Sequence, residues 1–231
     1  MKKFVPPALI IAFVLSSLLM LPLPRASAQA GLASSIINKM EKNRQSLRSV
    51  SADISMEKYN AQLRDSDKYY GTIEYIPVAG RSAFVRLEWN KPSHEILAIA
   101  NGAYVLYRPR LNQALVGTTG SVKGKDNDVL ALLNMSASQL RSRFGDFQDT
   151  REETLWGGVT ATHLKAVPRA AASYKYIEVW VDDSGMPVQT KMVEKNDDST
   201  TVRLSNIAKN QNIDKSAFEL KLDSSVKKIK G

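Results

Sequence analysis

The sequence predicts an α+β domain: one antiparallel sheet of ten or eleven strands, strongly curved or partly closed, with helices on one face. Three observations lead to this fold class. One amphipathic helical segment stands near the start, many short segments of period two follow with few turn residues between them, and two short helical segments interrupt these in the middle of the chain. Because the connections are short, neighbouring strands should be antiparallel.

Residues 1–28 have the pattern of a secretory signal peptide. Two lysines precede an apolar run from Ala8 to Leu23, and a series of small residues ending at Ala28 follows it. The run is short for a bilayer span, which needs about 20 apolar residues. We expect cleavage after Ala28, with Ala30 as the alternative, and a single soluble domain over residues 29–231 in the periplasm.

The composition excludes several classes of protein. With 43% hydrophobic and 24% charged residues, the chain is neither a disordered polymer nor a multi-span membrane protein. There is no cysteine, which excludes disulfides, thiolate metal sites and an N-terminal lipid carried on a cysteine. Loss of three positive charges with the signal peptide lowers the net charge from +9 to +6. For an exported protein this basic surface suits anionic lipids or acidic protein patches, or simply solubility, and nucleic acid is not expected as a partner.

The first elements of the domain follow from the spacing of the apolar residues. From Leu32 to Leu47 these residues recur at helical spacing, which predicts an amphipathic helix. At Val50 the period of the apolar residues changes to two, which predicts a strand with one solvent-exposed face. Asn101-Gly102 has the composition of a type I′ hairpin turn, in which both central residues need positive φ. The segments that share the strand pattern are Tyr69 to Ile76, Ser82 to Trp89, Glu95 to Ala100, Tyr104 to Tyr107 and Gln113 to Gly117.

The second half of the domain begins with a loop and two short helices. Residues 118–127 are rich in Gly, Thr, Ser and Lys, which predicts a loop. Asp128 can cap a first short helix, and Ser136 with Gln139 forms a capping box for a second, which Gly145 ends. The strand segments that follow are Thr154 to Val167, Tyr174 to Val181, Pro187 to Glu194, Thr200 to Ser205 and Ala217 to Leu222.

Two of the strand segments, Ser82 to Trp89 and Tyr174 to Val181, are apolar on both faces. A sheet with one solvent-exposed face needs apolar side chains on its other face only. Either helices cover the second face, or the concave face of the sheet lines an apolar cavity for a ligand.

No residue pattern indicates an enzyme, a metal site or a cofactor. His94 and His163 lie far apart, and no nucleophile elbow is present. Residues 119–126 depart from a phosphate-binding loop at both of its ends, because Thr119 replaces the first glycine and Asp126 replaces the final Ser or Thr. The paired carboxylates in the turns lack the alternation that a calcium loop needs. A hydrolase with two distant carboxylates stays open, although nothing nominates a pair.

The segment Val85-Arg86-Leu87-Glu88-Trp89-Asn90-Lys91-Pro92 is similar to the aromatic-Arg-aromatic-Glu-aromatic-x-x-Pro segment of the LolA-type periplasmic lipoprotein carriers. Further motifs follow in the order of that family, and the resemblance covers nearly all of residues 32–226. These motifs are Gly71-Thr72-Ile73, Glu95-Ile96-Leu97, Asn101-Gly102, Leu106-Tyr107-Arg108-Pro109, Gln113-Ala114, Asp183-Ser184-Gly185-Met186-Pro187 and Phe218-Glu219-Leu220.

The resemblance implies an incomplete β-barrel whose concave apolar face is capped by helices, and a function of carriage without catalysis. Val85 and Leu87 replace the family's commonest aromatic residues, and Ile76-Pro77 stands where the family has an arginine beside a proline. That arginine holds the helical lid shut in the family. Arg86 is the nearest candidate to replace it, by donating hydrogen bonds to carbonyls at the ends of the lid helices; the alternative is that Arg86 points into solvent.

These inferences define a candidate site. The resemblance implies that the ligand is the acyl chains of lipoproteins or other lipids, exchanged between an inner-membrane donor complex and an outer-membrane acceptor, and we expect a monomer. The alternative is an envelope sensor or regulatory binding module on the same fold, which usually has a second domain for which the 29–231 segment leaves no room. The residues expected to line the cavity are Leu87, Trp89, Ile96, Leu106, Ile177 and Val179. The residues expected to form the lid are Val129, Leu130, Leu132, Leu133, Leu140 and Phe144.

Overall fold

The computed structural model describes residues 25–78, 82–119 and 135–231, with side chains from residue 31 onward. The predicted signal peptide falls almost entirely outside the described residues. Within the described residues, no helix is both long enough and apolar enough to cross a membrane.

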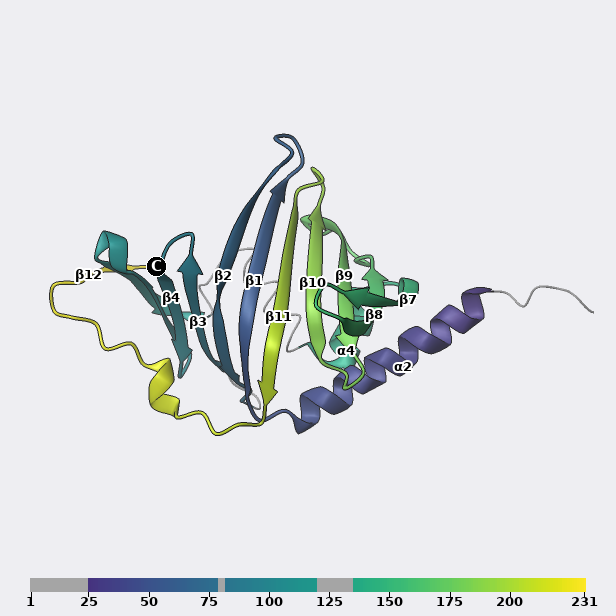
Figure 1. Cartoon of the computed structure of the whole chain (residues 1–231), viewed down its shortest axis with the longest axis horizontal. Helices are drawn as coiled ribbons and strands as arrows, with labels where there is room; N and C mark the ends of the chain where they lie inside the picture. The colour runs from purple at the N-terminus through teal and green to yellow at the C-terminus, as the bar shows by residue number, and fades with distance from the viewer. Residues whose placement is uncertain (1–24, 79–81, 120–134) are drawn as a thin grey trace, which may run out of the picture.

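A single curved sheet forms the body of the molecule, as the sequence predicts (Figure 1), and among the described residues it has twelve strands where ten or eleven were expected. The strands lie in the order β12-β6-β5-β4-β3-β2-β1-β11-β10-β9-β8-β7, and every neighbouring pair is antiparallel except β12 and β6. The sheet therefore has two free edges, β12 at one end and β7 at the other. Its strands are β1 (Val50–Asn60), β2 (Asp65–Ile76), β3 (Phe84–Lys91), β4 (Glu95–Ala100), β5 (Ala103–Arg108), β6 (Gln113–Thr118), β7 (Gln148–Leu155), β8 (Val159–Ala166), β9 (Tyr174–Asp182), β10 (Pro187–Glu194), β11 (Ser199–Lys209) and β12 (Lys227–Lys230).

The helices confirm the sequence prediction where the structure describes them. Helix α2 (Arg25–Ser46) contains the predicted amphipathic segment, and the short helix α4 (Ala137–Arg143) opens with the expected capping box between Ser136 and Gln139. The predicted helix after Asp128 lies outside the described residues. Two single-turn 3₁₀ helices, η2 (Pro109–Leu111) and η4 (Lys215–Phe218), complete the chain.

Two strand predictions need correction. The run from Thr154 to Val167 is not one strand, because residues 156–158 turn the chain between β7 and β8, with both glycines at positive φ. The run Ala217 to Leu222 is not a strand either: Asp214 accepts a hydrogen bond from the backbone N–H of Ser216 and starts η4 instead. The last strand of the sheet is β12, which the sequence analysis did not predict.

Helices α2 and α4 cover one face of the sheet, which we call the inner face (Figure 1). The core cluster combines apolar side chains of both helices with side chains of the central strands and of β8 to β11. Its members include Ala33, Ile36, Met40, Ile54, Met56, Leu140, Phe144, Leu164, Ile177, Val179, Val202 and Leu204.

The opposite face, which we call the outer face, carries different packing contacts at the two ends of the sheet. Over β3 and β4 the C-terminal segment crosses the sheet, and Phe218 of η4 packs on Phe84 with ring centroids 5.6 Å apart. Over β8 and β9 the wholly buried ring of His163 lies 4.7 Å from the ring of Trp180 and contacts the carbonyl of Asp149 through Nδ1 at 2.9 Å. The C-terminal segment thus covers the outer face of β3, whereas on the outer face of β9 Trp180 is buried and Tyr176 and Glu178 stay partly exposed.

Candidate functional site

The register of the sheet aligns leucines and an isoleucine across five strands on the inner face. Each residue of this set stands opposite the next on the neighbouring strand, so their side chains form a continuous row from β2 to β6. We call it the apolar row: Ile73, Leu87, Leu97, Leu106 and Leu115. A second row beside it contains Tyr75, Val85, Ile99 and Tyr104.

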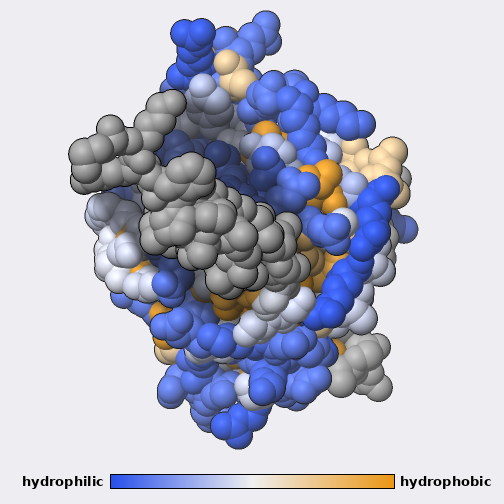
Figure 2. Space-filling view, turned by 90° about the vertical axis from the view of Figure 1, so that its right-hand side faces the viewer, coloured by the Kyte–Doolittle hydropathy of each residue, from blue (hydrophilic) through white to orange (hydrophobic). Residues whose placement is uncertain are grey.

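The two rows extend beyond the core. Ile73 and Leu87 belong to the core cluster, and Leu97 packs against it, whereas Leu106 and Leu115 lie outside it and are half-buried. Figure 2, which views the molecule from the right-hand side of Figure 1, shows hydrophobic residues gathered in the middle of that side and hydrophilic ones around them. Leu106 and Leu115 thus offer apolar surface on the inner face that the described core does not use, which is what an apolar ligand requires.

The structure separates the six predicted cavity residues into three groups. Leu87 and Leu106 are in the apolar row, and Trp89, two residues along β3, shares their face. Ile177 and Val179 are on the same face of the sheet but in the core, with exposed fractions of 2% and 4%. Whether the five bind a ligand stays a prediction.

Ile96 needs correction. It stands opposite Glu88 on β3 and Tyr107 on β5, so it lies on the outer face, and its neighbour Leu97 occupies the inner face. The segment Glu95-Ile96-Leu97 carries apolar residues at adjacent positions, and alternation alone does not tell which of them faces inward.

Tyr75 places a polar group among these apolar side chains. Its hydroxyl is buried and has no hydrogen-bond partner among the described residues. Burial raises the pKa of Tyr75 from 10.0 to about 12, while the nearby charge of Arg44 acts in the opposite direction. A buried hydroxyl without a partner costs free energy, so it is available to donate to an oxygen of a bound molecule, such as a carbonyl at the head of an acyl chain.

The described end of the predicted lid is anchored in the core. Leu140 and Phe144 are 2% and 1% exposed and belong to the core cluster. Val129, Leu130, Leu132 and Leu133 lie outside the described residues, so their role as a cover stays a prediction.

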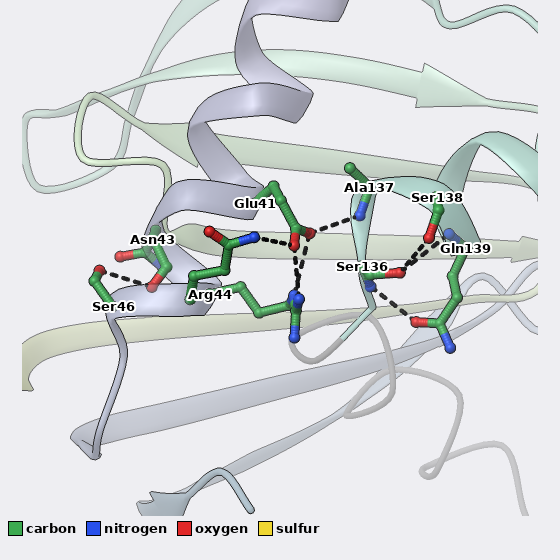
Figure 3. Close-up of polar contacts among 9 residues, drawn as sticks. Glu41, Asn43, Arg44, Ser46, Ser136, Ala137, Ser138 and Gln139 are labelled. Atoms are coloured by element: carbon green, nitrogen blue, oxygen red, sulfur yellow. Dashed lines mark hydrogen bonds and ion pairs between the residues drawn. The ribbon is translucent and has the colours of Figure 1, made fainter. Parts of the chain in front are cut away.

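A carboxylate of α2 holds α4 in place (Figure 3). Glu41 accepts a hydrogen bond of 2.9 Å from the backbone N–H of Ala137, the first residue of α4, and two more from Arg44 at 2.6 and 3.1 Å. The N–H groups of the first helical turn have no partner within the helix, so this carboxylate satisfies one of them. The hydrogen bonds from Arg44 and from Ala137 hold the pKa of Glu41 at about 2, below its usual value of 4.5. No local sequence signal marks this contact, because it joins residues 96 positions apart.

The other end of α4 is held by an arginine that the sequence analysis did not select. Arg169 donates to the carbonyl of Phe144 at 2.6 Å and to that of Arg141 at 3.2 Å. Arg86, which we expected at such carbonyls, instead donates to the carbonyl of Ala217 in η4 at 3.0 Å and pairs with Glu88 at 2.9 Å. At α4 the contact predicted for Arg86 is made by Arg169, and Arg86 contacts the C-terminal segment on the outer face.

We expect Glu41→Gln to weaken the α2 to α4 contact in a pH-dependent way. Because the folded-state pKa of Glu41 is lowered, its stabilising contribution is fully present above the unfolded value of 4.5 and is lost as the pH falls through about 2. Solvent screens this partly exposed ion pair, so the loss at neutral pH should be about 1 kcal/mol, less than the pKa shift alone implies.

Urea unfolding of Glu41→Gln and of the parent protein between pH 2 and 7 measures this difference. Glu57→Gln is the matched control, because Glu57 is on β1 and only approaches Lys68 to 4.0 Å. A difference between variant and parent that stays constant down to pH 2 would contradict the assignment.

A pocket of about 780 Å³ lies on the outer face over β1, β2 and β11, bordered by the turn between β7 and β8. Its lining combines polar and apolar residues, and exposed Trp156 stands at its border, where the Arg203 guanidinium lies 6.0 Å from the indole ring. The residues that line it are Asp53, Ile54, Ser55, Tyr70, Gly71, Thr72, Asn90, Lys91, Trp156, Gly157, Val159, Arg203, Ser205 and Asn206. The sequence analysis did not predict this pocket.

Comparison with known proteins identifies the family. The family model described as "Outer membrane lipoprotein carrier protein LolA" matches residues 78–221, more than half of the chain. The chain belongs to the LolA family. No curated protein matches this LolA family member in sequence.

Solved structures support the fold assignment. LprF from Mycobacterium bovis is 10% identical, with a TM-score of 0.52, over 79% of this chain and 94% of that chain. The complex of MucA and MucB from Pseudomonas aeruginosa gives a TM-score of 0.50 at 15% identity, over 81% of this chain and 60% of that chain. The LolA family protein thus spans less than two thirds of that relative. At these identities the likeness concerns the fold alone.

Proposed function

We propose that this LolA family protein is a periplasmic carrier that binds the acyl chains of lipoproteins or other lipids on the apolar row and moves them toward the outer membrane. The observation that supports the proposal most is the extension of that row past the core, to half-buried Leu106 and Leu115. The family description, a lipoprotein carrier, agrees with it. No step of this function requires catalysis, a metal or a cofactor.

The physical problem of such a carrier is release. Burial of a 16-carbon chain stabilises the complex by about 0.8 kcal/mol per CH₂, or about 13 kcal/mol in total, which approaches the strongest known non-covalent binding. A face open at one side buries only part of each chain and so keeps exchange possible. The contact of Glu41 with Ala137 fixes one end of the predicted lid. Movement of the rest of the lid would then control the access of an acyl chain to the apolar row.

The second candidate is a sensor or regulatory binding module on the same fold. It is favoured by the structural likeness to MucB, which is solved in complex with MucA. In that function the partner would be an envelope protein, and lipid would act as the signal and not as the cargo.

Native mass spectrometry tests the proposal. The chain is produced with its own leader, purified from the periplasm without detergent, and measured intact for a retained ligand. We expect a complex heavier than the chain by the mass of a phospholipid or an acylated lipopeptide. A fluorescent fatty acid should displace this bound lipid. If the chain instead co-purifies with a protein partner and carries no lipid, the sensor function is favoured. If the chain carries no ligand and does not bind the fatty acid, neither the carrier nor a lipid-responsive sensor is supported.

A further inference from the structure

We propose that the free edge of the sheet at β12, together with the turn between β5 and β6, docks on an anionic membrane surface. The inference rests on the proposed carrier function and names the place where such a carrier meets the bilayer. We call this region the basic edge; it consists of Arg108, Arg110, Leu111, Lys227, Lys228, Ile229 and Lys230.

The positive charge of the basic edge is concentrated and exposed. Strand β12 carries three lysines in four residues, all exposed, and Arg110 in the adjoining turn is exposed as well. Within the part of the chain that the structure describes, these lysines make no ion pair, whereas Arg108 pairs with Glu95 at 3.5 Å. Cations without partners keep their full attraction for an anionic lipid surface.

Two apolar side chains are exposed among these charges. Leu111 is 56% and Ile229 is 38% exposed. Lysines on an edge strand also prevent unwanted pairing with other sheets, but that role does not need an exposed leucine beside them. Apolar residues among basic ones are the combination with which a protein surface enters the headgroup region of a membrane.

The basic edge is a built part of the fold. The backbone N–H of Lys227 donates to the carbonyl of Asn112 at 3.0 Å, and the Asn112 amide donates to the carbonyl of Ser225 at 3.0 Å. These bonds join the turn after η2 to the start of β12, so the two sources of charge keep a fixed separation. In Figure 1 the edge stands at the far end of the molecule from α2.

The position of the edge connects it to the apolar row. Lys228 and Ile229 pair with Ala114 and Leu115 of β6, so the basic edge is immediately beside the last member of the row. From this edge inward, Ile229 is followed by Leu115 and then by Leu106. An acyl chain leaving the membrane would therefore reach the inner face with little passage through water.

Binding to vesicles tests the inference. The parent chain is mixed with vesicles of phosphatidylglycerol in phosphatidylcholine and with vesicles of phosphatidylcholine alone, and sedimented at low and at high salt. We expect binding only to the anionic vesicles, decreasing as salt screens the charges. Replacement of all three lysines, Lys227→Gln with Lys228→Gln and Lys230→Gln, should lower the partition coefficient about a hundredfold, at about 1 kcal/mol for each lysine.

The matched control removes the same charge elsewhere. Lys39→Gln with Lys42→Gln and Arg48→Gln changes three exposed cations in α2 and in the loop that follows it, and should leave vesicle binding within about twofold. Leu111→Ser should weaken the binding that persists at high salt. Equal loss in both triple variants, or no binding of the parent to anionic vesicles, would overturn the inference. Fatty-acid affinity measured on the same variants separates the two proposals, since loss of docking with unchanged fatty-acid binding leaves the carrier function intact.

Discussion

Leu106→Glu should lower the affinity for a fluorescent fatty acid by about thirtyfold or more. Leu106 is in the middle of β5, fourth in the apolar row, and is half-buried outside the core. A carboxylate at this position would have to lose its water against the acyl chain without a partner, which costs at least about 2 kcal/mol. Because the side chain does not support the core, the fold should tolerate the change.

Titration of the fatty acid with each variant measures the effect, and far-UV circular dichroism checks the fold. Ala103→Glu is the control, because it places the same charge on the exposed outer side of the same strand. Ala103→Glu should bind as the parent does. If Leu106→Glu also binds normally, the acyl chain does not use the apolar row, and the carrier proposal loses the observation on which it depends.

Alternation of apolar and polar residues predicted most strands because side-chain direction along a strand is a local property. The same holds for the turn at Asn101-Gly102, where φ is 51° and 79°, and for the capping box at Ser136. These features depend on residues within four positions of one another, and the sequence shows them directly.

Alternation and local motifs do not predict features that depend on contacts between distant segments of the chain. The inner position of Leu97 rather than Ile96 is set by the curvature of the sheet and by the C-terminal segment that covers the outer face. Glu41 meets Ala137, and Arg169 meets Phe144, across sequence separations of 96 and 25 residues. Glu41 looks like any solvated charge of an amphipathic helix, so no periodicity distinguishes it.

The predicted cavity residues illustrate both what local alternation shows and what depends on distant segments. Leu87 and Leu106 were expected to face a ligand, and the register of the sheet places them opposite Leu97 between them. Ile177 and Val179 share the face but are covered as part of the core. The sequence specifies which residues are apolar, whereas the placement of α2 and α4 decides which of them are left for a ligand.

Gly185→Ala should destabilise the protein by about 3 kcal/mol or more, because this glycine is where the turn between β9 and β10 meets α2. An added Cβ would lie 2.3 Å from the carbonyl oxygen of Lys39 and 2.5 Å from its carbonyl carbon. Both atoms are helix backbone, so α2 itself would have to move away from the sheet. The φ of 83° adds the cost of a left-handed conformation, about 1 to 2 kcal/mol for a residue with a side chain.

Gly102→Ala separates these two costs. Gly102 has a φ of 79°, but a Cβ there would meet no atom within 4 Å, so only the conformational cost of about 1 to 2 kcal/mol should appear. Urea unfolding of both variants gives the difference, which we attribute to the displacement of α2. Because α2 covers the core strands and holds α4 through Glu41, Gly185→Ala should also raise the rate at which a bound fatty acid is released. Equal destabilisation by the two substitutions would show that α2 yields easily and is not the fixed support of the lid.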